Sequence, residues 1–181
     1  MHPHHRTIER FFLGLGRLDA GHMVNCLAPD AEYWSLAIGR LSGERVPAFW
    51  RLVCARDNLR RLRVEHLEAD DYVGRARWSA QYACGRLTVR QVTDTVFRFR
   101  RGRILRQEDR LELCPGGRTI GSEELLQEER APLLMRLRAR VLVSIDDLLA
   151  REAIVDPPSG VRARLRSAHG LPPRRREARA R

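Results

Sequence analysis

The chain has 181 residues, of which 43% are hydrophobic, a composition typical of one globular domain with an appendage, and this excludes a wholly disordered protein. No apolar run approaches the roughly 20 residues that a membrane-spanning helix needs, and the N-terminus is too charged for a secretory signal. We therefore expect a cytoplasmic protein without a membrane anchor. The formal net charge of +11 comes from arginine alone, because the sequence contains no lysine.

The N-terminal part of the chain predicts three helices and one strand. Residues 6–17 place apolar side chains at helical spacing, with Thr7 as the expected N-cap. Asp19 is expected to cap a second, shorter helix, and residues 31–39 predict a strand. A third helix opens at Ser42. Its apolar stripe consists of Val46, Phe49, Trp50, Val53 and Cys54.

From residue 62 onward the apolar pattern changes to period two, which is typical of strands. Four such runs are separated by Gly74, by Gly85 and by a turn at residues 100–102, and this order predicts an antiparallel meander. Three helices followed by a long antiparallel sheet indicate an α+β domain over residues 1–117.

Residues 118–156 predict a helical extension. Ser122 is expected to start one helix and Pro132 a second, because proline fits the first turn of a helix. A single apolar stripe on the second helix can pack on the domain, on a second subunit or on both. It consists of Leu134, Leu137, Val141, Ile145 and Leu148.

Residues 157–181 carry eight arginines and one glutamate and predict a basic, disordered tail. Such a tail can contact nucleic acid through its charge. It lacks the interleaved aromatic residues with which single-strand binders stack bases, so we do not expect nucleic acid as the partner.

The remaining histidines and cysteines give no metal or redox motif. The histidines of the N-terminal MHPHH are expected to belong to a frayed end. The four cysteines show no CxxC spacing and no neighbouring histidine, so they are expected to be small buried hydrophobes. They are Cys26, Cys54, Cys84 and Cys114.

The segment RGRILRQEDRLELC, residues 101–114, brings three acidic residues together in a basic chain. As a strand it has one face of alternating charges, which suits water. The other face carries Gln107 and Asp109 among leucines. A carboxylate in that position must be hydrogen-bonded, protonated or facing a cavity, because an isolated buried charge is too costly.

The same alternation places polar side chains on the inward faces of the neighbouring strands. Tyr82 shares an apolar face with Trp78, and the next strand begins with inward Gln91, Thr93 and Thr95. Apolar walls with a few convergent polar groups indicate a ligand cavity rather than a packed core. The expected lid and apolar walls are Trp34, Phe49, Trp50 and Val53.

Four strings carry a resemblance to a known family: IERFFLGLGRLDAGHMVNCLAPDAEYW, LSGERVPAFWRLV, VFRFRRGRI and RQEDRLEL. From about Thr7 to Cys114 the chain resembles the nuclear transport factor 2-like superfamily, in its SnoaL-like branch. The resemblance implies a cone-shaped curved antiparallel sheet packed on three N-terminal helices, here with a helical C-terminal extension. It also implies a pocket in the mouth of the cone and, often, a homodimer.

The family contains polyketide cyclases, ketosteroid isomerases, limonene-epoxide hydrolases, dehydratases and non-catalytic binding modules. In the cyclases an aspartate on the last long strand is the general acid/base, and Asp109 matches it. Where many relatives have Asp-Pro after the first strand, this chain has Ser35-Leu36. Gln107 replaces a common histidine, and Arg110 replaces the usual second acid.

Two functions remain open. The first is a cofactor-independent enzyme of the cyclase, isomerase or dehydratase type, without a metal, acting on a hydrophobic polyketide-like or terpenoid-like substrate. Asp109 would move the proton, and Tyr82 or Gln107 would stabilise a developing oxyanion. The second is a non-catalytic ligand-binding or dimerisation module. The residues expected to bind substrate are Trp34, Phe49, Trp50, Val53, Trp78, Gln91, Thr93 and Thr95.

Overall fold

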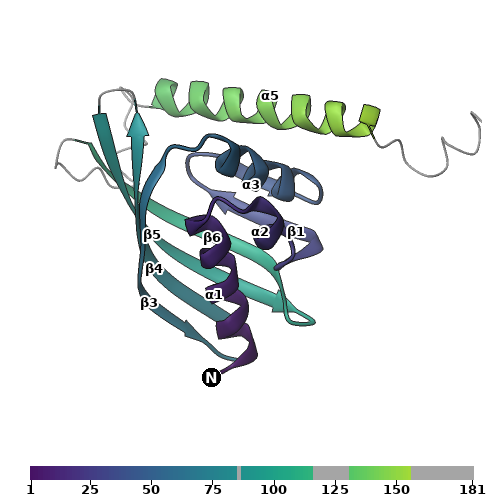
Figure 1. The fold of residues 1–181 in the computed structure, drawn as a ribbon, viewed down its shortest axis with the longest axis vertical. Coiled ribbons are helices and arrows are strands. Elements are labelled where there is room, and N and C mark those ends of the chain that lie inside the picture. Colours follow the sequence, from purple (N-terminus) through teal and green to yellow (C-terminus); the bar gives the residue numbers. More distant parts are fainter. Residues whose placement is uncertain (85–86, 116–130, 156–181) are drawn as a thin grey trace, which may run out of the picture.

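A computed structural model of the chain describes residues 1–84, 87–115 and 131–155. It shows one curved six-stranded sheet with helices on its concave side and a long helix across its wide end (Figure 1). In chain order the elements are α1 (Pro3–Gly16), α2 (Ala20–Val24), β1 (Leu27–Ser35), β2 (Gly39–Ser42), α3 (Arg45–Ala55), β3 (Leu59–Ala69), β4 (Val73–Cys84), β5 (Leu87–Arg100), β6 (Arg103–Pro115) and α5 (Ala131–Val155).

The sheet has the strand order β2-β1-β6-β5-β4-β3. Strands β3 to β6 form the predicted antiparallel meander. Two features were not predicted. Strand β2 pairs antiparallel with β1, and β1 pairs parallel with β6, so the sheet is mixed. A period-two pattern identifies the faces of a strand but not its neighbour, so the β1–β6 pairing could not be predicted.

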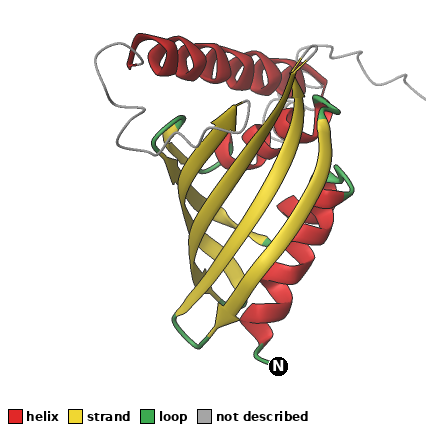
Figure 2. Cartoon of the chain, turned by 90° about the vertical axis from the view of Figure 1, so that its left-hand side faces the viewer, coloured by secondary structure: helices red, strands yellow, loops and turns green. Residues whose placement is uncertain are grey.

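The first helix fills the concave side of the sheet (Figure 2). Ile8, Phe11, Phe12 and Leu15 are all buried, and the Phe11 ring meets the Trp50 ring edge-on at a centroid distance of 5.1 Å. The helix approaches the sheet closely at Gly74, where an added Cβ would lie 2.5 Å from Ile8 Cδ1. A larger residue at that position of β4 would force the Ile8 and Phe99 side chains to shift.

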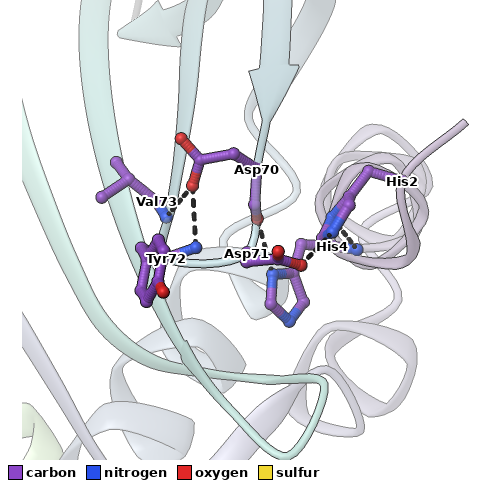
Figure 3. Close-up of polar contacts among 6 residues, drawn as sticks. All are labelled: His2, His4, Asp70, Asp71, Tyr72 and Val73. Carbon is purple, nitrogen blue, oxygen red and sulfur yellow. Dashed lines mark hydrogen bonds and ion pairs between the residues drawn. The ribbon is translucent and has the colours of Figure 1, made fainter.

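The expectation of a frayed N-terminus is wrong. Helix α1 begins at Pro3, and His2 is its N-cap, whose Nδ1 accepts a hydrogen bond from the His4 backbone N–H. His2 Nε2 lies 2.9 Å from a carboxylate oxygen of Asp71, and His4 Nδ1 lies 2.9 Å from the Asp70 carbonyl oxygen (Figure 3). These contacts join the helix to the β3–β4 turn.

One predicted cap and one predicted helix start also differ from the structure. Thr7 lies inside α1, where its single hydroxyl hydrogen is within reach of two acceptors, the Gly102 carbonyl oxygen at 3.0 Å and the Pro3 carbonyl oxygen at 3.3 Å. Helix α3 begins at Arg45 because Ser42 is still a strand residue, paired with Glu32 of β1. The predicted cap at Asp19 is confirmed, with its carboxylate 2.9 Å from the His22 backbone nitrogen.

The convex face of the sheet is covered by charged side chains. Ion pairs cross neighbouring strands there, for example Arg77–Asp94 at 2.7 Å, while Arg106 and Glu108 pair along β6 at 2.7 Å. None of the helices in the described part of the chain has an apolar stretch long enough to cross a bilayer. Cys26 and Cys54 are buried free thiols, as predicted, whereas the side chains of Cys84 and Cys114 lie outside the described set.

Helix α5 lies across the wide end of the cone and packs on α3 (Figure 1). The predicted apolar stripe meets the chain's own core, because Val141 and Ile145 are buried in it. Ion pairs Arg45–Asp146 at 2.6 Å and Arg51–Glu152 at 3.1 Å flank the contact.

A second contact also places α5 on the cone. The Arg138 guanidinium lies over Gly39, where an added Cβ would collide with it. The helix predicted from Ser122 and the basic tail at 157–181 lie outside the described residues.

The docking of α5 can be tested with two β-branched residues of the same helix. Ile145→Ala should lower the free energy of unfolding by about 2–4 kcal/mol, because Ile145 is fully buried and its removal leaves a cavity. Val143→Ala should change it by less than about 0.5 kcal/mol, because Val143 is 60% exposed. Urea unfolding of the full chain measures both, and equal effects would contradict the docking.

Candidate functional site

A cavity of about 310 Å³ lies between the concave face of the sheet, α3 and α5. Its wall is mostly apolar, and the polar groups are few. Helix α3 contributes Phe49, Trp50 and Val53, and α5 contributes Val141. The volume is at the small end of the range for ligand pockets, which is about 300–1,000 Å³.

Most of the residues predicted from alternation reach this cavity. Asp109, Tyr82, Trp78 and Gln91 of the sheet line it together with the three α3 residues. The four sheet residues come from three adjacent strands, β4, β5 and β6. The antiparallel register of these strands places Thr95 opposite Asp109 and Gln91 opposite Ala80.

Three other predicted residues lie behind the cavity wall rather than on it. Gln107, Thr93 and Thr95 are buried, with exposed fractions of 1%, 0% and 2%. Thr95 and Gln107 contact Asp109 directly. Thr93 accepts a hydrogen bond from Gln91 Nε2 at 2.8 Å and so positions a cavity residue.

Trp34 does not lie where we expected. It faces outward from β1, is 39% exposed, and is not part of the cavity wall. The reason is alternation along β1: Tyr33 and Ser35 point inward, so Trp34 between them points outward, in register with Glu108 on β6.

The Asp109 carboxylate is 3% exposed and accepts three hydrogen bonds. Thr95 Oγ1 donates to Oδ1 at 2.8 Å and Gln107 Nε2 donates to the same oxygen at 3.1 Å. Tyr33 Oη donates to Oδ2 at 3.1 Å. An ionised carboxylate oxygen has two lone-pair sites, so both sites of Oδ1 are occupied while Oδ2 keeps one free.

Burial raises the pKa of Asp109 to about 6, although the hydrogen bonds from Gln107, Thr95 and Tyr33 each lower it. Burial and the charge of Asp109 raise the pKa of Tyr33 well above its usual value, and the same two causes, burial first, raise that of Tyr82 to about 12. Both phenols therefore remain protonated and can donate. The site combines one titrating carboxyl with neutral donors.

Sequence reasoning missed Tyr33 and Ser35. Both reach the site because β1 runs parallel to β6, with Tyr33 in register with Gln107 and Ser35 with Asp109. Ser35 is fully buried and its hydroxyl accepts the Ile38 backbone N–H at 3.2 Å. Alternation along residues 31–35 puts either Trp34 or its two neighbours on the inward face. We predicted Trp34, and so Tyr33 and Ser35 were assigned to the outer face.

Two polar residues between α3 and β3 were also missed. Arg56, which follows the last residue of α3, and Asn58, which precedes β3, both line the cavity. Their segment follows a helix and carries no periodicity, so nothing in the sequence marked it. Within residues 1–84, 87–115 and 131–155, no three His, Cys, Asp or Glu side chains are grouped to hold a metal ion.

The buried Trp50 Nε1 has no hydrogen-bond partner among the described residues, although Trp50 lines the cavity. Buried donors are nearly always satisfied in folded proteins. A polar group of a bound molecule is one way to satisfy this one.

No known family profile matches the sequence, and no curated protein matches it either. Several solved structures match its fold. An LEH-like epoxide hydrolase from M. tuberculosis is 18% identical, with a TM-score of 0.54, over 79% of this chain and 94% of that one. TerC, co-crystallised with polyporic acid, is 16% identical, with a TM-score of 0.50, over 60% of this chain and 90% of that one.

A third similar structure is a nuclear transport factor 2-like protein of unknown function from Burkholderia pseudomallei, 18% identical over 60% of this chain and 90% of that one, with a TM-score of 0.46. The curved sheet around α1, with a cavity at the wide end, agrees with the architecture implied by the sequence motifs. The chain therefore shares its fold with the LEH-like epoxide hydrolase and with TerC.

Proposed function

We propose that this chain is a cofactor-independent enzyme that acts on a hydrophobic small molecule by general acid/base catalysis at Asp109. The observation that carries the proposal is the environment of this carboxyl. It lines an apolar cavity, is held by three donors, and has a pKa raised to about 6 by burial. A general base works best when its pKa lies near the working pH.

The free lone pair of Oδ2 is the expected site of proton transfer. Both lone-pair sites of Oδ1 are used by Thr95 and Gln107, whereas Oδ2 accepts only from Tyr33. At neutral pH the carboxylate can remove a proton from a carbon next to a carbonyl group, and the electron pair moves onto the carbonyl oxygen. Tyr82, protonated and on the wall, can donate to that oxygen.

Asp109 is the only carboxyl group on the described cavity wall. One carboxyl can take a proton from one carbon and return it to another atom, which is the chemistry of isomerases, aldol-type cyclases and dehydratases. The apolar walls favour a polyketide-like or terpenoid-like substrate. A hydrolysis that needs a separate acid and base is less well supported, even though a similar structure is called an epoxide hydrolase.

The alternative is a non-catalytic ligand-binding or dimerisation module of the same fold. The presence of a single acid favours this alternative, because one buried carboxyl is enough to bind a ligand without catalysing a reaction. An enzyme of this kind removes a proton from carbon in the bound molecule, whereas a binding module does not. Measuring proton exchange separates the two functions.

Proton abstraction can be measured without knowing the product. Cyclic ketones and polyketide-like β-diketones incubated with the protein in deuterated water should gain deuterium next to the carbonyl group, detected by mass spectrometry. Asp109→Asn should slow this exchange by about 10²–10⁴-fold, which is the usual contribution of a general base. Glu108→Gln should leave it unchanged, because Glu108 is its sequence neighbour on the outer face, paired with Arg106. Equal exchange by the wild type and Asp109→Asn would favour the binding module.

The hydrogen bonds to Asp109 predict the direction of a pKa change. Thr95→Val removes a donor that stabilises the charged form, so the pKa of Asp109 should rise above about 6. Thr93→Val, equally buried but bonded to Gln91, should leave it unchanged. Carboxyl carbon NMR shifts followed against pH report both values. A fall in the pKa for Thr95→Val would contradict the assignment.

The raised pKa also predicts a cost in stability. The folded-state pKa of about 6 exceeds the usual 3.8, so the stability that the group contributes is present below pH 4 and is lost as the pH rises to about 6. The loss at pH 8 should be about 2–3 kcal/mol, since one pKa unit is about 1.4 kcal/mol. Urea unfolding at pH 4 and pH 8 should therefore show Asp109→Asn gaining stability, relative to the wild type, at the higher pH. If the free energy of unfolding changed equally with pH in both proteins, the pKa of Asp109 would not be raised by burial.

A further inference from the structure

The wall of the cavity carries two charged side chains among the described residues, Asp109 and Arg56. Asp109 is buried, whereas Arg56 is exposed at the point where α3 ends. Every other side chain on this wall is apolar or neutral. A cavity with a negative and a positive group can orient a ligand that carries a charge of its own.

The two charges lie at different ends of the cavity. The segment that holds Arg56 is tied to the end of β4, because the Ala83 backbone N–H donates to the Asn58 carbonyl oxygen at 2.8 Å. At the other end Phe49 stacks on Tyr33, which hydrogen-bonds Asp109. Arg56 follows Phe49 by seven residues, which is about 10 Å along a helix.

The Arg56 end offers hydrogen-bond donors and no acid. Within the described residues Arg56 forms no ion pair, and it is not among the groups that hydrogen-bond Asp109. Asn58, two residues after Arg56, also lines the cavity. A guanidinium presents paired N–H donors that match the geometry of a carboxylate.

From these positions we propose that the ligand of this cavity is a hydrophobic carboxylic acid. Its carboxylate binds Arg56 at the outer end, and its apolar body lies against Phe49, Val53 and Trp78. The negative charge of Asp109 excludes the carboxylate from the inner end, so the ligand enters in one orientation only. On the proposed function, this orientation presents the carbon remote from the carboxylate to Asp109.

The proposal can be tested with two probes of the same shape, 2-naphthoate and 2-naphthamide. Isothermal titration calorimetry of the full chain at pH 8 should show tighter binding of the acid, by about tenfold, which is the usual effect of one charge-assisted hydrogen bond. Arg56→Gln should remove this preference and leave the affinity for the amide unchanged. Arg60→Gln is the matched control, since Arg60 is an exposed arginine of β3 outside the cavity wall, and it should keep the preference.

Three results would overturn the proposal: equal affinities of the wild type for acid and amide, a preference that survives Arg56→Gln, or no binding of either probe up to its solubility limit. Asp109→Asn separates this proposal from the catalytic one. It should bind the acid at least as tightly as the wild type, because a repelling charge is gone, while it loses proton exchange. If the wild type prefers the acid but exchanges no protons, the proposed ligand class is supported and the proposed enzymatic function is contradicted.

Discussion

A carboxylate inside an apolar core needs hydrogen-bond donors, and most of this fold is arranged to bring donors to Asp109. The donors come from three strands: Tyr33 from β1, Thr95 from β5 and Gln107 from β6 itself. Trp78 of β4 adds support by donating from Nε1 to the Thr95 hydroxyl at 2.9 Å. Four strands therefore converge on one side chain, and the site depends on the order and register in which these strands pair.

The parallel pairing of β1 with β6 is the step that completes this arrangement. Without it Tyr33 would have no route to Oδ2, and the carboxylate would keep donors on one oxygen only. The same pairing sets Ser35 beside Asp109 and turns Trp34 to solvent. The register of one strand pair thus determines which residues belong to the site.

The sequence predicted those features that depend on local periodicity. Alternation alone placed Asp109, Gln107 and Thr95 on one inward face, and the helical stripe placed Phe49 and Trp50 against it. It could not predict which strand lies beside β6, because pairing between distant segments leaves no local pattern. For this reason Tyr33 was missed. Arg56 was missed because its segment has neither helical nor strand periodicity.

The C-terminal stripe shows a different limit of sequence reasoning. Spacing identified Val141 and Ile145 as apolar neighbours on a helix, but it left open whether they meet the domain or a second subunit. The structure places them in the chain's own core, with Val141 on the cavity wall. The helix thus contributes to the cavity wall.

The ion pairs that join α5 to α3 contribute little to the docking of the helix compared with its buried apolar side chains. Arg45–Asp146 and Arg51–Glu152 lie in water, with every side chain at least 40% exposed. Exposed pairs contribute at most about 1 kcal/mol each and weaken as dissolved salt screens them over about 8–10 Å. Rising ionic strength therefore weakens the two ion pairs but not the buried contacts of Val141 and Ile145, so α5 should stay docked in concentrated salt.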